Sequence, residues 1–187
     1  MSLARLARLA LWSALVTAVA ALAWSTRLGT RWPAVYYMTG PSMEPAVHAR
    51  ELFLTWSPPG ALDRGDLVIF EFTDADGEYH VLRRLVGLAG DTVAMADGRL
   101  FLNGRGVPWP FRVLEPRART SPFAMVSDLY TWGPWIVPAD SVFIVSDTRD
   151  HLGWPDSRFI GPVPRAHLIA RATRTLTGRR LTPKQSR

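Results

Sequence analysis

One serine of this chain lies in a segment that could hold a nucleophile in a fixed position. Ser42 belongs to the run Gly-Pro-Ser-Met-Glu-Pro at residues 40–45, so that glycine and proline surround it. These residue types favour turns, and a serine in such a turn is by itself an ordinary turn residue. A serine hydroxyl attacks a carbonyl group only when a neighbouring base accepts its proton. Ser42 could therefore perform acyl transfer, provided that the fold brings a base to it.

Three further blocks follow Ser42 along the chain. They are Arg-Gly-Asp at residues 64–66, Arg-Arg-Leu-Val-Gly-Leu-Ala-Gly-Asp at residues 83–91, and Asp-Thr-Arg-Asp at residues 147–150, which is followed by Asp-Ser-Arg at residues 156–158. In this order and approximate spacing, the four segments resemble those of bacterial type I signal peptidases. These are membrane-anchored serine proteases that remove signal peptides from exported proteins. The resemblance covers roughly residues 37–173.

The resemblance implies a role for each matching position. Ser42 takes the place of the nucleophile, and Met43 that of the apolar neighbour that packs beneath the substrate. The Asp-Thr-Arg-Asp and Asp-Ser-Arg segments of the third block flank the site in the family and hold its geometry through ion pairs. The supporting residues implied in this way are Asp147, Arg149, Asp156, Ser157 and Arg158. The resemblance implies neither a metal nor a cofactor.

Two positions depart from the family pattern. Arg83 stands where the family carries the lysine that activates the serine, and the only lysine of the chain is Lys184, near the C-terminus. Arginine keeps its proton at any ordinary pH, so it cannot act as a general base. The loop between Asp150 and Asp156 is also two residues longer than usual and lacks the serine that orients the lysine.

Two histidines are candidates for a substitute base, because neutral imidazole accepts a proton near pH 7. His151 lies in the loop that approaches the active site in the family, whose endoplasmic-reticulum relatives pair a serine with a histidine. His80 is three residues from Arg83 on a predicted strand, and this odd spacing predicts that the two side chains lie on opposite faces. Each histidine could also be an ordinary surface or structural residue.

Three functions remain open from the sequence. The first is an active signal peptidase with a substitute base, and the second is a weak or inactive homologue that binds exported or membrane proteins. The third is a membrane-tethered scaffold that shares only the architecture.

The formal charge of +6, which comes from arginine, suits contact with anionic lipid headgroups. Nucleic acid is not expected, because no nucleic-acid motif accompanies the charge. The absence of cysteine excludes disulfides and thiol chemistry.

The N-terminal segment is predicted to anchor the chain. Residues 9–26 carry no charged side chain, and about eighteen residues at about 1.5 Å each nearly span a bilayer core. A cleavable export signal is the alternative. The resemblance implies a bacterial plasma-membrane protein with a cytoplasmic N-terminus and an extracytoplasmic catalytic domain. The predicted organisation is residues 1–8 cytoplasmic, 9–26 transmembrane, 27–36 juxtamembrane linker, 37–176 catalytic domain and 177–187 disordered basic tail.

Short apolar runs separated by turn residues predict an all-β domain after the anchor. The resemblance implies that it is built of coiled antiparallel sheets. An Asn-Gly pair at residues 103–104 indicates a hairpin with a type I′ turn. The expected strands cover residues 67–72, 79–86, 100–102, 141–145 and 167–170. Preprotein signal peptides and membrane lipid are the partners that the resemblance implies.

Overall fold

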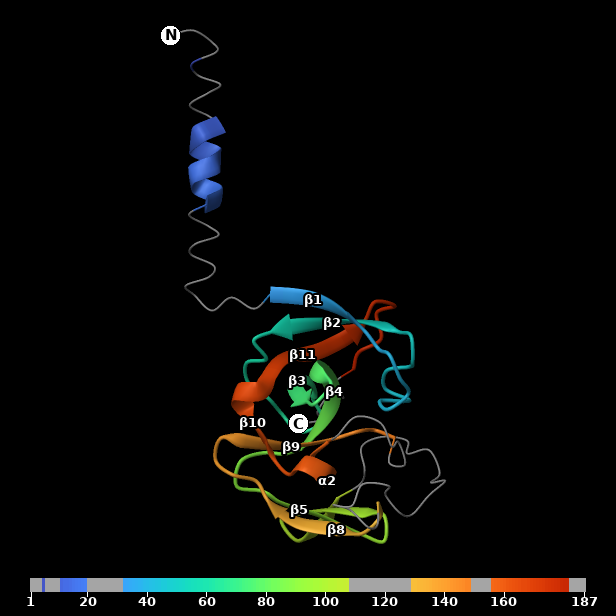
Figure 1. Ribbon diagram of the computed structural model, residues 1–187. Coiled ribbons are helices and arrows are strands. Elements are labelled where there is room, and N and C mark those ends of the chain that lie inside the picture. Colours follow the sequence, from blue (N-terminus) through green and yellow to red (C-terminus); the bar gives the residue numbers. More distant parts are fainter. Residues whose placement is uncertain (1–4, 6–10, 20–31, 108–128, 149–155, 182–187) are drawn as a thin grey trace. The chain divides into compact units, whose positions relative to one another are not determined.

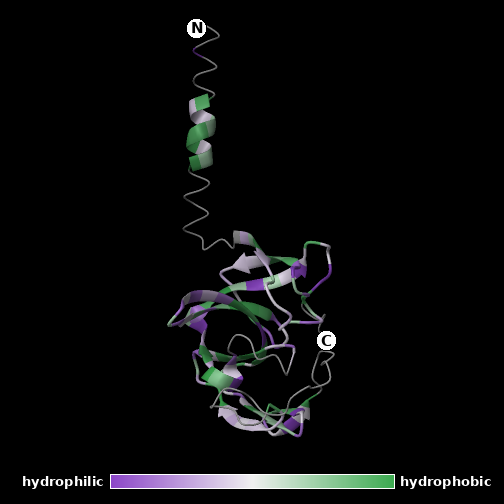
Figure 2. Ribbon diagram, turned by 45° about the vertical axis from the view of Figure 1, so that its right-hand side comes forward, coloured by the Kyte–Doolittle hydropathy of each residue, from purple (hydrophilic) through white to green (hydrophobic). Residues whose placement is uncertain are grey.

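The computed structural model describes residue 5 and residues 11–19, 32–107, 129–148 and 156–181. It divides into one unit from Met1 to Trp32 and a second from Pro33 to Arg187. Residues 11–19 of the first unit are helical, and Figure 2 shows that this helix is mostly apolar. Within the described part of the chain, no helix is long and apolar enough to cross a membrane. The predicted span at 9–26 extends beyond the described helix on both sides.

The second unit contains two antiparallel sheets (Figure 1). The larger has seven strands in the order β1-β2-β11-β3-β4-β9-β10, and the smaller has four in the order β7-β6-β5-β8. The strands of the larger sheet are β1 (Trp32–Tyr37), β2 (Leu52–Ser57), β3 (Leu67–Asp74), β4 (Gly77–Gly87), β9 (Ser141–Val145), β10 (Val163–Pro164) and β11 (Leu168–Thr175). Those of the smaller sheet are β5 (Thr92–Ala96), β6 (Arg99–Leu102), β7 (Arg105–Val107) and β8 (Trp132–Ile136). The all-β prediction is therefore confirmed.

Both faces of the central strands are buried, which explains their nearly continuous apolar sequence. Leu67 and Ile69 of β3 pack in one core cluster, whereas Val68 and Phe70 pack in another on the opposite face. A third cluster lies under the smaller sheet and includes Phe143 of β9. This third cluster joins the two sheets, and the short helix α2 (Ser157–Ile160) lies between β9 and the smaller sheet (Figure 1).

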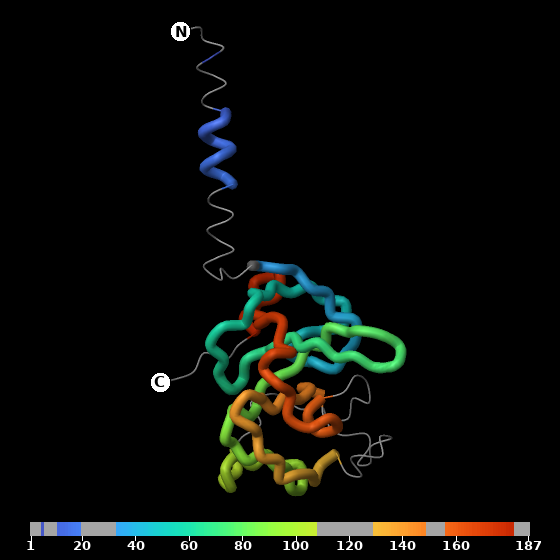
Figure 3. The backbone as a smooth tube through the Cα atoms, turned by 60° about the vertical axis from the view of Figure 1, so that its left-hand side comes forward, coloured from blue at the N-terminus to red at the C-terminus, as the bar shows by residue number. Residues whose placement is uncertain are grey.

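The local turn chemistry follows the sequence closely. Asn103 and Gly104 both have positive φ, 53° and 76°, as a type I′ hairpin turn requires, and they join β6 to β7. β3 and β4 form a long hairpin in continuous register, and its tip at 74–77 projects from the body of the domain in Figure 3. β4 continues to Gly87, where it changes partner register against β9.

The structure differs from the predicted boundaries at both ends of the domain. β1 begins at Trp32, inside the segment predicted as a linker, and belongs to the larger sheet. The C-terminal segment was predicted to be disordered from residue 177, and this is wrong for residues 177–181. The backbone N–H of Leu181 donates to the carbonyl of Thr173, and its side chain is buried in the cluster that contains Met43. An isolated apolar residue gives no periodic pattern, so the sequence did not reveal this contact.

Candidate active site

Ser42 lies in the turn that follows β1, and the loop after β9 holds it in place. The backbone N–H of Thr148 donates to the Ser42 carbonyl at 3.1 Å, and the Thr148 hydroxyl donates to the carbonyl of Pro41 at 3.0 Å. Met43 is fully buried and packs with Val47 in the core cluster beneath the turn. Thr148 is the second residue of the Asp-Thr-Arg-Asp block, and sequence reasoning missed its role. Its hydroxyl is the signal that could have identified it.

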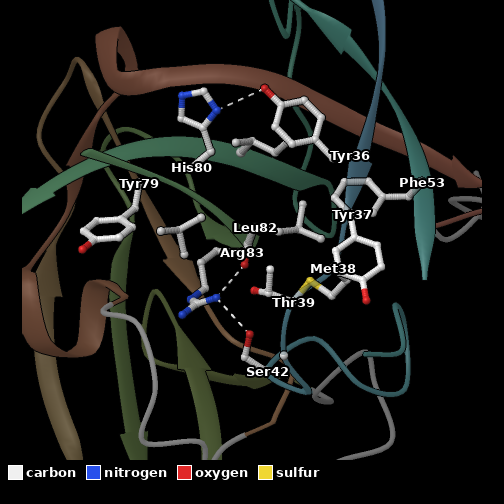
Figure 4. A pocket seen from close by; sticks show the side chains of 13 residues that line it. Tyr36, Tyr37, Met38, Thr39, Ser42, Phe53, Tyr79, His80, Leu82 and Arg83 are labelled. Carbon is white, nitrogen blue, oxygen red and sulfur yellow. Dashed lines mark hydrogen bonds between the residues drawn. The ribbon is translucent and has the colours of Figure 1, made fainter. Parts of the chain in front are cut away.

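Arg83 of β4 reaches the side chain of Ser42 (Figure 4). Its Nη1 donates to the Oγ of Ser42 at 3.2 Å and to the carbonyl oxygen of Leu82 at 2.7 Å. Burial lowers the pKa of Arg83 to about 10, although the nearby carboxylate of Asp156 opposes this shift. Because pH 7 lies about three units below that value, only about one molecule in a thousand carries a neutral Arg83. Arg83 is therefore a hydrogen-bond donor to Ser42 at neutral pH.

A buried ion pair fixes the next residue of β4. The Nε of Arg84 donates to one carboxylate oxygen of Asp147 at 2.7 Å, and its Nη2 donates to the other at 2.5 Å. Its Nη1 donates to the carbonyl of Gly65 at 2.7 Å. Such a two-pronged contact gives one defined geometry. It joins β4 to the segment after β9, immediately before Thr148, which contacts the Ser42 turn.

A second buried ion pair holds the start of α2. Asp156 caps this helix by accepting from the backbone N–H of Arg158, and the Arg158 guanidinium contacts both carboxylate oxygens of Asp156. Ser146 joins the pair, because its Oγ accepts from Arg158 Nη2 at 2.6 Å. Burial alone would raise the pKa of Asp156, but the charge and hydrogen bonds of Arg158 lower it overall. Ser157 accepts from the backbone N–H of Ile144 through its Oγ at 2.9 Å.

Most of the residues predicted to support the site thus lie in one buried network. Asp147, Asp156, Ser157 and Arg158 are all at most 3% exposed, and they surround the end of β9 and the start of α2. Arg149 and His151 lie outside the described residues. The Arg-Gly-Asp block at 64–66 contributes the carbonyl that Arg84 contacts, while Arg64 pairs with Asp91.

The other candidate base, His80, points away from Ser42 in Figure 4. Its Nδ1 lies 3.3 Å from the hydroxyl oxygen of Tyr36, and the described residues give it no hydrogen bond to Ser42. Both His80 and Arg83 nevertheless line the same cavity, although their spacing predicted opposite faces. β9 pairs with β4 only from Arg84 onward, so β9 does not cover the edge of β4 at residues 79–83. All five of these residues line the cavity, which therefore extends along this edge and meets both faces of the strand.

This cavity has a volume of about 390 Å³, and Ser42 and Arg83 both contribute to its wall (Figure 4). The rest of its lining is mainly apolar and aromatic. It comprises Tyr36, Tyr37, Met38, Thr39, Gly40, Phe53, Ile69, Tyr79, His80, Val81 and Leu82. An extended peptide with apolar side chains fits such a lining.

A group of possible metal ligands lies on the exposed face of the β3–β4 hairpin. Atoms of Glu71, Glu78 and His80 that could bind a metal lie within 4.8 Å of one another, and all three residues are exposed. Exposed acidic groups of this kind commonly occur without an ion, and the chemistry of Ser42 needs none.

Known proteins share sequence similarity with this chain. A family model described as "Signal peptidase, peptidase S26" matches residues 8–176. Signal peptidase I S of Bacillus subtilis (strain 168) is 35% identical over 120 residues, which cover 62% of this chain and 62% of that protein. Signal peptidase I of Leptolyngbya laminosa is 32% identical over 148 residues, which cover 73% of this chain and 64% of that protein. The chain thus spans less than two thirds of the length of either relative.

A solved structure is also similar. It is the crystal structure of a signal peptidase I from Enterococcus faecalis V583, with 23% sequence identity and a TM-score of 0.42. The match covers 59% of this chain and 95% of that chain.

Proposed function

This chain belongs to the S26 signal peptidase family, and from that premise we propose that it is a membrane-anchored serine endopeptidase that cleaves signal peptides from exported preproteins. One observation carries the proposal. The Oγ of Ser42 lies at the wall of an apolar cavity and accepts a hydrogen bond from Arg83, the residue that the resemblance matches to the family's lysine. A peptide that enters the cavity along the edge of β4 would bring its carbonyl to this hydroxyl.

The proposed reaction has two steps. Ser42 Oγ attacks the scissile carbonyl carbon as a base takes its proton, and the amine of the mature protein leaves with a proton. Water then attacks the acyl-enzyme, the bond to Ser42 Oγ breaks, and the serine regains its proton. The negative oxygen that develops in each step needs a hydrogen-bond donor, and the backbone N–H of Ser42 is the proposed one.

We assign the base role to His151 rather than His80. His80 is engaged with Tyr36, whereas His151 is three residues from Thr148, whose backbone N–H contacts the Ser42 carbonyl. Arg83 would then hold the serine hydroxyl and its charge would favour the developing oxyanion.

The predicted anchor completes the proposal. The uncharged residues 9–26 would span the plasma membrane with residues 1–8 on the cytoplasmic side. The domain from residue 37 would lie on the extracytoplasmic side, where preproteins emerge. Contact with anionic lipid is favoured by the arginine-rich composition.

A second candidate function is favoured by the charge of Arg83. A protonated guanidinium bonded to Ser42 Oγ cannot accept the serine proton, and both the lysine and its orienting serine are replaced. The domain would then bind exported or membrane proteins through the cavity with weak catalysis or none.

Cleavage of a model preprotein by the purified full chain in non-ionic detergent tests both candidates. We expect the wild type to cleave, both Ser42→Ala and His151→Ala to lose cleavage, and the control His167→Ala to keep it. This result would support the peptidase function with His151 as the base. Loss in His80→Ala instead would move the base role to His80. Cleavage that persists in Ser42→Ala would overturn the assignment of the nucleophile. A silent wild type whose activity appears in Arg83→Lys would favour the binding function.

A further inference from the structure

We propose that Arg179 is a positioning residue for Ser42. Together with Leu181 it clamps the loop that carries the serine, so that loss of its side chain slows the chemical step without weakening peptide binding. The catalytic part of this inference rests on the proposed function, whereas the clamp itself does not. Both residues follow residue 176, where the match to the family model ends, so the resemblance assigns them no role.

The serine loop, residues 38–51, is closed at its base by backbone hydrogen bonds. The N–H of Met38 donates to the carbonyl of Glu51 at 2.9 Å, and the N–H of Arg50 donates to the carbonyl of Met38 at 2.7 Å. Thr148 contacts the first half of the loop, where Ser42 lies. The second half, residues 45–51, is held by the C-terminal segment.

The guanidinium of Arg179 binds three acceptors in this second half. Its Nη1 donates to the carbonyls of Pro45 at 3.0 Å and Ala46 at 2.6 Å, and its Nη2 donates to the Glu51 carboxylate at 2.5 Å. The same carboxylate accepts from the backbone N–H of His48 at 3.0 Å. Because the donors of a guanidinium lie in one rigid plane, Arg179 fixes the middle of the loop relative to its base.

Leu181 fixes this clamp to the domain. Its side chain is 4% exposed in the core cluster that contains Met43 and Val47, two fully buried residues of the serine loop. The backbone N–H of Thr175, at the end of β11, donates to the carbonyl of Arg179 at 2.9 Å. The C-terminal segment therefore contacts both the backbone of the loop and its buried side chains.

The contacts of Arg179 predict a local effect on the chemistry. Its side chain is 40% exposed, so its ion pair with Glu51 contributes little to global stability. Without the clamp the serine loop can shift, and a misplacement of about 1 Å at a reacting group can slow a reaction about a hundredfold. Among the described residues, the cavity lining includes neither Arg179 nor its three acceptors, so the apolar contacts to a bound peptide stay in place.

Hydrogen exchange of the full chain in non-ionic detergent at pH 7, measured by mass spectrometry, tests the clamp without catalysis. Arg179→Gln should speed the exchange of amides in residues 44–51 at least about fivefold, among them the Val47 N–H that donates to Met43. Amides of β5 and β6 should be unchanged. The matched control is Arg180→Gln, because this exposed neighbour forms no side-chain hydrogen bond with the part of the chain that the structure describes.

Cleavage kinetics with the model preprotein measure the positioning. Arg179→Gln should lower kcat at least about tenfold and change KM less than about twofold, because the serine is misplaced while the peptide still binds. Arg180→Gln should change neither constant. Both variants should unfold at the same denaturant concentration as the wild type. An earlier midpoint in Arg179→Gln alone would give this residue a general structural role and overturn the inference.

Unchanged exchange of residues 44–51 in Arg179→Gln would overturn the clamp. Faster exchange with an unchanged kcat would overturn the positioning role. A wild type that cleaves nothing would remove the proposed peptidase, and the exchange result alone would then decide whether Arg179 holds the serine loop. The failure of the proposed function and the failure of this inference are therefore distinguishable.

Discussion

Nη1 of Arg83 donates a hydrogen bond of 3.2 Å to Oγ of Ser42, and both residues are at most 3% exposed. The two residues are 41 positions apart in sequence, and β4 brings them together. Since the guanidinium donates to Oγ, the hydroxyl proton points elsewhere and is available to another acceptor. Arg83 thus orients the Ser42 side chain, and in the proposed reaction a group other than the protonated Arg83 accepts the serine proton.

The pH dependence of cleavage identifies that acceptor. If a histidine accepts the proton, log kcat/KM should rise with a slope of one below about pH 6.5, where an ordinary imidazole titrates, and then level off. Arg83 has a pKa of about 10, so its charge stays constant across the plateau from pH 7 to 9. A rate that instead rises about tenfold per pH unit from pH 7 to 10 would make neutral Arg83 the base.

Acid should destabilise the protein through Asp91. Burial alone would raise the pKa of this carboxyl, but hydrogen bonds from Asn103 and the Leu88 N–H, together with Arg64, lower it overall. A lowered pKa means that the unfolded state binds the proton more tightly. The stabilisation is therefore present above about pH 4 and lost as the pH falls towards the native pKa.

Denaturant unfolding between pH 7 and pH 3 measures this effect. Asp91→Asn should lower the free energy of unfolding by about 1–3 kcal/mol at pH 7 and make it less sensitive to acid. Asp140→Asn, at an exposed position, should leave the loss of unfolding free energy on acidification unchanged. If Asp91→Asn loses as much stability on acidification as the wild type, other carboxylates govern the effect.

The ordered C-terminal segment predicts unequal effects for two leucines. Leu181 is 4% exposed within the core cluster around Met43, whereas Leu176 is 55% exposed. Leu181→Ala should lower the free energy of unfolding by about 2–4 kcal/mol, and Leu176→Ala should change it by less than about 0.5 kcal/mol. Chemical denaturation of both variants checks this. Equal small effects would mean that Leu181 does not pack in solution as it does here.

A close approach at Gly87 predicts a similar contrast between glycines. A Cβ atom there would lie 2.7 Å from Cγ2 of Val93 and 3.0 Å from Cβ of Phe143. Gly87→Ala should therefore lower the free energy of unfolding by about 1–3 kcal/mol through overpacking. At Gly106 the nearest atom, on Phe101, is 3.7 Å away, so Gly106→Ala should cost less than about 0.5 kcal/mol. Thermal unfolding distinguishes the two, and a tolerated Gly87→Ala would show that the strands can separate locally.

Local sequence signals alone were sufficient to predict much of the fold. The Asn-Gly pair requires positive φ at two successive residues, which selects one hairpin turn, and the strand at 141–145 was predicted with the observed bounds. The order of the motif blocks also indicated which family the chain belongs to, because each block can be recognised without knowing what it contacts.

The tertiary structure decided which of these residues meet. The sequence spacing predicts that the side chains of His80 and Arg83 lie on opposite faces of their strand. The cavity nevertheless runs along an edge of β4, and both residues line it. Leu181 lacks any periodic neighbours, so its burial depends on a contact with a distant part of the chain. The sequence by itself determined the residue types, and so predicted an arginine, Arg83, at the position that the resemblance matches to the family's lysine. Only the fold determined that this charge is buried against Ser42, because burial and distance depend on packing between segments far apart in sequence.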